Sequence, residues 1–537
     1  MRLVARPIAL PPTPALLGAL ALAYALLGLL GHDPWKAEDA IGIGIVHQML
    51  AHGQWVIPHL AGEPYFEDGP LFYWLSALCA KLTGAVLAEH DGARLASGVA
   101  LAATAWLAYL AGRALYDKSA GTGAALVLLG CLGLLVHAHE TLAEMGMLAT
   151  QALALYAVAI APRHAARGAV LLGAGIAGAL LCKGPAAVAM PFAAALLAPV
   201  LSAGWRNRRY AATFAGGVLV AALIIGAWVA SVESQHPGLT TALLRLQLAQ
   251  LAFPTLRTVS AYAKTLAWAS WPAWPIACWA LWEGRRRPAD GGTRVLLAAV
   301  VAALAVLFAQ WDVHDVNTVQ LVLPLALLAG PGAGTLRRGA ANALAWFGAL
   351  SATLFGFLVW LGWIAMMTGF PERLARNFTR LEPGFVPHFA WLPLLVASTL
   401  TIAWIWLLAR SEHSTFRGVT YWCAGLTLLW GLAMTLWLSW VDYGKSYRPV
   451  ALGLQKALPK NTRCIESRGL GEAQRAAFDY HAEIVTARLE RRAKADCPFL
   501  LVQGREGASD PVSAAWVQVW EGNRPHDRER YRLYRRK

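Results

Sequence analysis

The residues best suited to chemistry lie in a polar, acid-rich stretch at 32–70, between the first apolar run of the chain and the later ones. Asp33 opens this stretch, directly after an apolar run long enough to cross a membrane. An ionisable residue at the end of a membrane helix is a candidate functional residue by default. Two adjacent carboxylates, Glu67 and Asp68, close the stretch and could together hold a divalent cation. We therefore place the chemistry of the protein in this loop.

The composition indicates a polytopic membrane protein. Of its 537 residues, 57% are hydrophobic and only 14% are charged, and mean hydropathy is +0.47, which excludes a soluble enzyme with one ordinary core. Apolar runs of the length that crosses a bilayer as a helix number about thirteen. They cover residues 13–31, 93–111, 119–137, 141–161, 168–183, 185–202, 211–231, 261–282, 295–311, 316–330, 341–367, 390–409 and 418–440.

The basic residues predict the orientation, because short cytoplasmic loops collect Lys and Arg. With Arg2 and Arg6 inside, the Arg-rich loops after every second run also lie inside, whereas the loops on the other side carry acids and histidines. An odd number of spans then leaves the tail outside. The first run lacks a small-residue cleavage site, so we expect it to be a span rather than a cleaved signal peptide. The predicted domains are a membrane domain at 1–440, with an outer loop at 32–92, and a soluble domain at 441–537.

The tail has the pattern of a small α/β domain. Helical spacing at 446–458 and 471–480 alternates with short β-type runs at 462–466, 483–487, 499–503 and 516–520. Cys464 and Cys497 open two of these strands in what would be an oxidising compartment, so we expect a disulfide between them. The tail is basic, as is the whole chain with its net charge of +15. We reject nucleic acid as the partner and expect anionic lipid headgroups or a phosphorylated glycolipid, or else a plain solvated surface.

The charges also bear on the class of membrane protein. A secondary transporter usually carries ionisable groups near the middle of the bilayer and an internal repeat, and we find neither. The acids instead gather on one face, beside two segments, 40–50 and 71–82, that we expect to lie as helices along the outer interface. This arrangement favours an enzyme that acts on lipid-linked substrates.

Three motifs resemble those of a known family. The loop at 55–67, reading WVIPHLAGEPYFE, follows an Asp at the end of the first span, as it does in the bacterial lipid A aminoarabinose transferases and protein mannosyltransferase-like membrane glycosyltransferases. Glu144 opens a segment at the position of an Asp-Met-Pro-Leu type motif, and 181–185 is similar to a Thr-Lys-Gly-Pro motif. The span count and the tail, which enters its first helix as Tyr-Arg-Pro at 447–449, agree. The resemblance covers nearly the whole chain.

The resemblance implies an all-α polytopic fold of the GT-C type with a small α/β domain on the periplasmic side of the bacterial inner membrane. Such enzymes transfer a sugar from a polyprenyl-phosphate donor to a lipid or glycan acceptor with inversion. They need a base for the acceptor proton and positive charge for the departing phosphate. The resemblance gives Asp33 the role of base; the alternative is a carboxylate that merely faces water. We expect a monomer among membrane lipids.

The phosphate site is predicted from several residues, each with a plainer alternative. Lys183 is the main candidate for a phosphate contact, against snorkelling to the interface. Lys36 could share the task or be a surface lysine, and Tyr65 could contact the phosphate or belong to an interfacial aromatic belt. Glu144 replaces a family Asp, or pairs with a neighbouring base. Glu67 corresponds to a family glutamate associated with a metal, with His236 as a possible partner, or is a plain loop residue.

The chain departs from the family pattern where the phosphate would bind. Asp68-Gly69-Pro70 follows Glu67 in place of Lys-Pro-Pro, so an anion replaces a cation, and the segment 312–324 contains no Tyr. A divalent cation held by Glu67 and Asp68 could supply the missing charge. Otherwise Asp68 faces solvent, and Lys183 with Lys36 supplies the charge. The alternatives to an enzyme are a catalytically inactive lipid-phosphate-binding scaffold and a lipid-linked sugar translocator.

Overall fold

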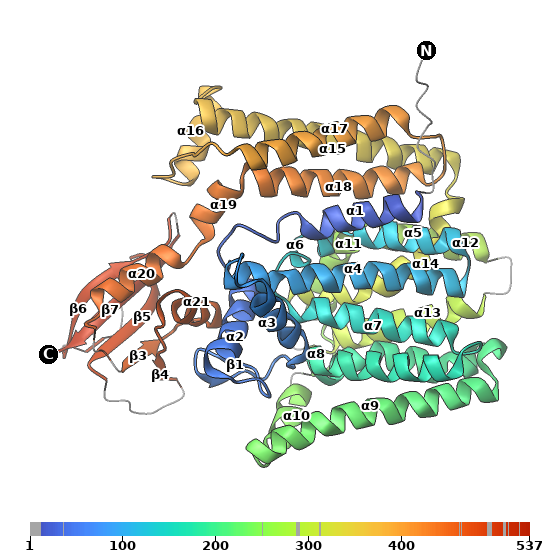
Figure 1. Ribbon diagram of the computed structural model, residues 1–537, viewed down its shortest axis with the longest axis horizontal. Coiled ribbons are helices and arrows are strands. Elements are labelled where there is room, and N and C mark those ends of the chain that lie inside the picture. Colours follow the sequence, from blue (N-terminus) through green and yellow to red (C-terminus); the bar gives the residue numbers. More distant parts are fainter. Residues whose placement is uncertain are drawn as a thin grey trace.

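A bundle of long helices forms most of the protein, and a small sheet domain extends from one end of it (Figure 1). The structure is a computed structural model. It describes residues 12–35, 37–249, 251–285, 290–310, 313–460, 462, 464–490, 497–507, 512–513, 515–525 and 527–537. The bundle helices are α1 (Pro14–Leu26), α4 (Glu89–Leu115), α5 (Lys118–Leu129), α6 (Leu132–His137), α7 (Ala143–Ile160), α8 (Ala165–Leu201), α9 (Arg208–Gln235), α11 (Leu256–Ala269), α12 (Ala273–Gly284), α13 (Gly291–Phe308), α14 (Val319–Thr335), α15 (Arg338–Thr368), α17 (Trp391–Arg410) and α18 (Arg417–Leu436).

The bundle has the burial pattern of a membrane domain. Within the described part of the chain, nine helices are long and apolar enough to cross a bilayer. Helix α14 is almost wholly buried, whereas α9 and α17 expose most of their apolar residues, as helices that face lipid do. The runs predicted at 13–31, 119–137 and 261–282 form helices shorter than 18 residues, two of them broken into pairs. The count of thirteen spans therefore stays a prediction.

Helix α8 is a hairpin of two antiparallel halves. Its backbone leaves helical geometry at Lys183 and Gly184. The carbonyl oxygens of Ala165 and Ala195 both accept hydrogen bonds from side chains near the start of α9, although a straight helix would hold them about 45 Å apart. Gly184 has a φ of +71°, a conformation that side chains disfavour, and a Cβ there would collide with Gln247. The sequence prediction of two separate apolar runs on either side of Gly184 agrees with this hairpin.

The connecting helices α2 (Glu38–His52), α3 (Leu71–Thr83), α10 (Leu239–Ala249), α16 (Glu372–Leu381) and α19 (Leu438–Lys445) gather at one end of the bundle, together with the sheet domain. We call it the site end. The hairpin of β1 (His59–Leu60) and β2 (Glu63–Pro64) lies there too. The segments 40–50 and 71–82 are helical as predicted. However, α2 does not lie on a lipid interface, because Ile43, Ile45 and Val46 are fully buried and α2 packs against the sheet domain and α3.

The sheet domain contains α20 (Arg448–Ala457), α21 (Glu472–Ala482) and a five-stranded sheet of order β4-β3-β5-β7-β6. The strands are β3 (Ile465–Arg468), β4 (Ala487–Arg488), β5 (Phe499–Arg505), β6 (Trp516–Gly522) and β7 (Glu529–Arg536). Strand β3 is parallel to β4 and β5, and β7 is antiparallel to β5 and β6. We did not predict β7, because its alternate arginines hide the strand pattern. Cys464 and Cys497 form the predicted disulfide, with their Cα atoms 5.2 Å apart.

Candidate functional site

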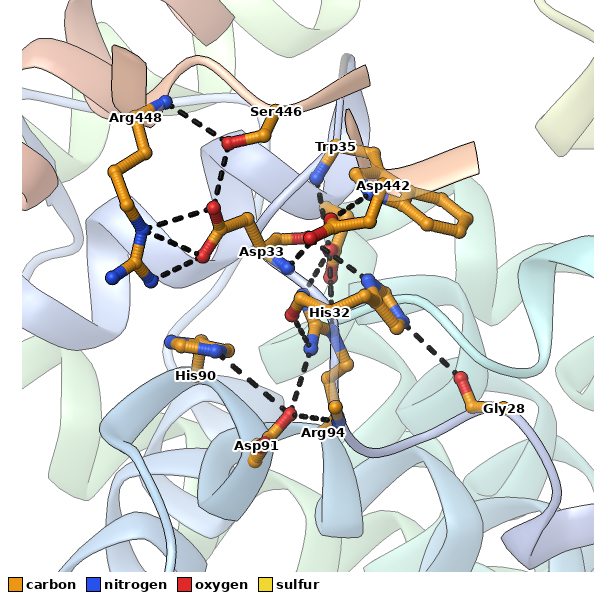
Figure 2. A network of polar contacts seen from close by, with 12 residues as sticks. Gly28, His32, Asp33, Trp35, His90, Asp91, Arg94, Asp442, Ser446 and Arg448 are labelled. Atoms are coloured by element: carbon orange, nitrogen blue, oxygen red, sulfur yellow. Dashed lines mark hydrogen bonds and ion pairs between the residues drawn. The ribbon is translucent and has the colours of Figure 1, made fainter. Parts of the chain in front are cut away.

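The carboxylate of Asp33 lies at the junction of the first loop and the sheet domain (Figure 2). Both of its oxygens accept hydrogen bonds from the Arg448 guanidinium, from Nε at 3.0 and 2.9 Å and from Nη2. The Ser446 hydroxyl donates to Oδ2 at 2.6 Å. The Asp33 residue is 8% exposed, and the Arg448 side chain is half exposed. The plainer alternative, a carboxylate that merely faces water, is therefore wrong, and the predicted base role requires Arg448 to release an oxygen.

The end of α19 holds the backbone of the same loop. Asp442 Oδ1 accepts hydrogen bonds from the Asp33 amide and from the Trp35 indole, both at 2.9 Å. The Lys445 ammonium lies over the Trp35 ring, 4.8 Å from its centroid. The side chains of Asp442, Ser446 and Arg448 therefore fix the position of Asp33, although more than 400 residues separate the two segments.

A buried ion pair holds the loop on the side of the helix bundle. Arg94, on α4, is fully buried and donates to both oxygens of Asp39 on α2 and to the carbonyl oxygen of His32 at 2.8 Å. Asp39 also accepts from the Thr141 amide at 2.9 Å. Breaking such a pair leaves an uncompensated buried charge, which costs about 3–5 kcal/mol. The loop is thus pinned to the bundle at one side of Asp33 and to the sheet domain at the other.

The electrostatics keep Asp33 ionised. Burial alone raises the pKa of Asp33, but the hydrogen bonds from Arg448 and Ser446 outweigh it, and the pKa lies below its usual value. The neighbouring Asp442 shifts the other way, because burial raises its pKa more than the Trp35 hydrogen bond lowers it. Burial, together with the Arg94 charge, lowers the pKa of His32 to about 4, so this histidine is neutral. Asp33 is therefore held in its ionised form, which is the form that can accept a proton.

A second polar cluster lies at the tip of the α8 hairpin. The Lys183 ammonium contacts Asp68 Oδ1 at 2.6 Å and Glu144 Oε1 at 2.8 Å, and the Tyr73 hydroxyl donates to Asp68 Oδ2 at 2.6 Å. Glu144 therefore pairs with a base, as its plainer alternative predicted. Asp68 is 9% exposed, so the prediction that it faces solvent is wrong. Burial raises the pKa of Asp68, although the Lys183 charge opposes the shift.

An apolar cavity adjoins this cluster. The first loop contributes Tyr65 and Asp68 to its wall, α8 contributes Gly184, and α9 and α10 contribute Trp228 and Gln247. The Tyr65 hydroxyl donates to Glu67 Oε2 at 3.2 Å, which orients it within the loop. Of the predicted site residues, Tyr65 and Asp68 thus line the cavity, and Asp68 joins it to the cluster with Glu144 and Lys183.

The predicted metal ligands do not form a site. Within the described ranges, no group of three or more His, Cys, Asp or Glu side chains is arranged to hold a metal ion. Asp68 is engaged by Lys183 and Tyr73, Glu67 by Tyr65, and His236 follows the end of α9. The residues therefore do not fit the expected divalent cation. Lys36 lies outside the described residues, so its predicted phosphate contact stays a prediction.

The sequence analysis missed most partners of Asp33. Its partners Asp442, Ser446 and Arg448 were not among the candidates, nor was Arg94, which supports the loop, because their proximity arises only from the tertiary fold. One signal was present, since the Tyr-Arg-Pro segment at 447–449 had been noted as a family feature. An arginine in that segment offers a guanidinium, which binds carboxylates and phosphates through paired hydrogen bonds.

Comparisons with known proteins agree with the resemblance. The model of the dolichyl-phosphate-mannose-protein mannosyltransferase family matches residues 67–230. The chain is 30% identical over 236 residues to an undecaprenyl phosphate-alpha-4-amino-4-deoxy-L-arabinose arabinosyl transferase of Pseudomonas fluorescens, covering 42% of this chain and 39% of that protein. It is 32% identical over 207 residues to a homologous transferase of Sodalis glossinidius, covering 37% and 36%. The chain thus matches under half the length of these relatives.

The fold comparison spans the whole molecule. The crystal structure of ArnT from Cupriavidus metallidurans bound to undecaprenyl phosphate superposes with a TM-score of 0.69, 17% sequence identity and coverage of 97% of both chains. The apo form of the same protein gives a TM-score of 0.70 at 16% identity. The predicted GT-C type membrane fold with a small C-terminal sheet domain is confirmed.

Proposed function

We propose that the protein is a membrane glycosyltransferase that transfers a sugar from a polyprenyl-phosphate donor to a lipid or other envelope acceptor. The observation that carries this proposal is the ionised Asp33, held by Asp442, Ser446 and Arg448, at the site end of a GT-C fold. The names of the relatives support it, since they are undecaprenyl phosphate aminoarabinose transferases. We place the site end on the periplasmic side of the inner membrane, because the Arg-rich loops lie at the opposite end.

The chemistry divides between the two polar clusters. The acceptor oxygen attacks the anomeric carbon, the bond from that carbon to the phosphate oxygen breaks, and the polyprenyl phosphate departs with the electron pair. Arg448 first releases its hydrogen bond to one oxygen of Asp33, and this oxygen then takes the acceptor proton. The apolar cavity beside Tyr65 holds the first part of the polyprenyl chain, with the phosphate toward Lys183.

Asp33→Asn tests the proposal. The amide keeps the shape of the carboxylate but cannot take a proton, and loss of a general base lowers the rate by roughly 10²–10⁴. The measurement is sugar transfer by the reconstituted protein, with mass spectrometry of envelope glycolipids used first to identify donor and acceptor. Asp290→Asn, an exposed position at the opposite end of the bundle, is the matched control.

The outcomes separate the three classes of function. Loss of transfer in the Asp33 variant, with lipid-phosphate binding intact, supports the enzyme. Near-native transfer by the variant contradicts the assignment of the base. Lipid-phosphate binding without turnover in the native protein indicates a scaffold, and movement of the unmodified lipid-linked sugar between leaflets indicates a translocator.

A further inference from the structure

Helix α16 carries three arginines whose purpose the proposed reaction does not explain. Arg373, Arg376 and Arg380 are spaced by three and four residues, so they lie on one face of the helix, along about 10 Å. All three are exposed. Among the residues that the structure describes, none of the three has a hydrogen bond or ion pair to another side chain. A guanidinium without a partner on a folded surface is available to an external anion.

The apolar contacts of α16, and the exposed aromatic residues that flank it, indicate its depth relative to the bilayer. The Phe378 ring packs edge-on against Trp437 and Trp440, with centroids 5.4 and 5.1 Å apart. The segments that flank α16 expose large apolar side chains, among them Phe370 at 71% and Trp391 at 70%. Exposed aromatic residues beside a helix end mark the boundary between lipid tails and headgroups. Helix α16 therefore lies at headgroup level, at the site end of the bundle (Figure 1).

The positive charge of α16 is unusual for a periplasmic loop. In the orientation of the proposed function, the loop between α15 and α17 is periplasmic. The rule that short loops collect Lys and Arg applies to cytoplasmic loops, so it does not explain arginines here. Three arginines at such a place require another partner. At headgroup depth, the available anions are lipid phosphates, whose oxygens accept paired hydrogen bonds from a guanidinium.

Helix α16 is also connected to the candidate base. The Trp440 indole donates to the Phe378 carbonyl at 3.4 Å, and the Tyr443 hydroxyl donates to the Pro383 carbonyl at 3.1 Å. Both donors lie on α19, and Asp442, which lies between them on that helix, accepts the hydrogen bond from the Asp33 amide. Whatever binds to α16 therefore restrains the helix that positions Asp33.

We propose that the arginine face of α16 is a docking site for the phosphodiester headgroups of anionic phospholipids in the surrounding leaflet. The face consists of Arg373, Arg376 and Arg380. Bound headgroups hold α16 and α19 in place, so that the site end is ordered by the membrane in which it works.

The test is lipid retention, measured by native mass spectrometry on the full chain in phosphatidylcholine nanodiscs with and without phosphatidylglycerol. Each basic residue near an anionic surface strengthens binding about fivefold, so replacing all three arginines by Gln weakens phosphatidylglycerol retention by roughly 100-fold. Replacing all three by Lys preserves most of it. The triple Lys variant is thus the matched control, because it changes the same three side chains and keeps their charge.

Two results overturn the proposal. One is equal retention of phosphatidylglycerol by the native protein and the triple Gln variant. The other is retention that is specific for a phosphorylated glycolipid and indifferent to phosphatidylglycerol, which would make the face an acceptor site. Arg376→Gln alone, with an expected loss of about fivefold, keeps the test decisive if the triple variant does not fold. Because retention requires no turnover, these outcomes are independent of whether the protein transfers sugar.

Discussion

Removing Arg448 should raise the pKa of Asp33 and move the pH profile of the reaction. Hydrogen bonds to a charged partner are worth about 1.5–3 kcal/mol in a buried site. The Arg448 side chain is 50% exposed, so solvent screening leaves on the order of 1 kcal/mol. One pKa unit corresponds to about 1.4 kcal/mol. Because Arg448 favours the ionised form, Arg448→Met should shift the acid limb of kcat/KM to higher pH by roughly 0.7 unit.

The assay is sugar transfer measured across pH, since the acid limb of kcat/KM reports the pKa of the base in the free enzyme. Ser446→Ala removes a neutral donor from the same carboxylate and should shift the limb in the same direction by less. Arg530→Met is the control, because Arg530 pairs with Glu506 in the sheet domain and does not contact Asp33. An acid limb that stays fixed in both the Arg448 and Ser446 variants would refute the assignment of Asp33 as base.

Three other predictions concern stability and metal. The disulfide closes a loop of 33 residues, so replacing Cys464 and Cys497 by Ser should destabilise the sheet domain by about 4 kcal/mol. Unchanged protease resistance of that domain would contradict this prediction. Lys183→Met leaves two carboxylates uncompensated and should cost about 3–5 kcal/mol in denaturant unfolding, whereas Lys183→Arg should cost clearly less. Transfer should persist in a chelator, because Asp68 is engaged by Lys183 and Tyr73; full loss, restored by added divalent cation, would revive the metal hypothesis.

The sequence predicted the features that depend on local pattern. Apolar length located the bundle helices, alternation located four of the five strands, and the position of Asp33 after the first run located the loop. Residue identity alone could not show that Lys183 would meet Asp68 and Glu144, because three separate segments converge there. It also could not show that the apolar residues of α2 face protein rather than lipid, since both environments favour the same side chains.

The pairing of Asp33 with Arg448 sets the earliest time at which a newly made chain can become active. The two residues are 415 positions apart, and a ribosome adds about 5–20 residues per second, so roughly 20–80 s separate their synthesis. During that interval the carboxylate lacks its guanidinium, and the first loop lacks the cover of α19 and the sheet domain. A chain that stops before residue 448 keeps the apolar helices needed for insertion but never assembles this junction. Membrane insertion and acquisition of the site are thus separate events in the life of the protein.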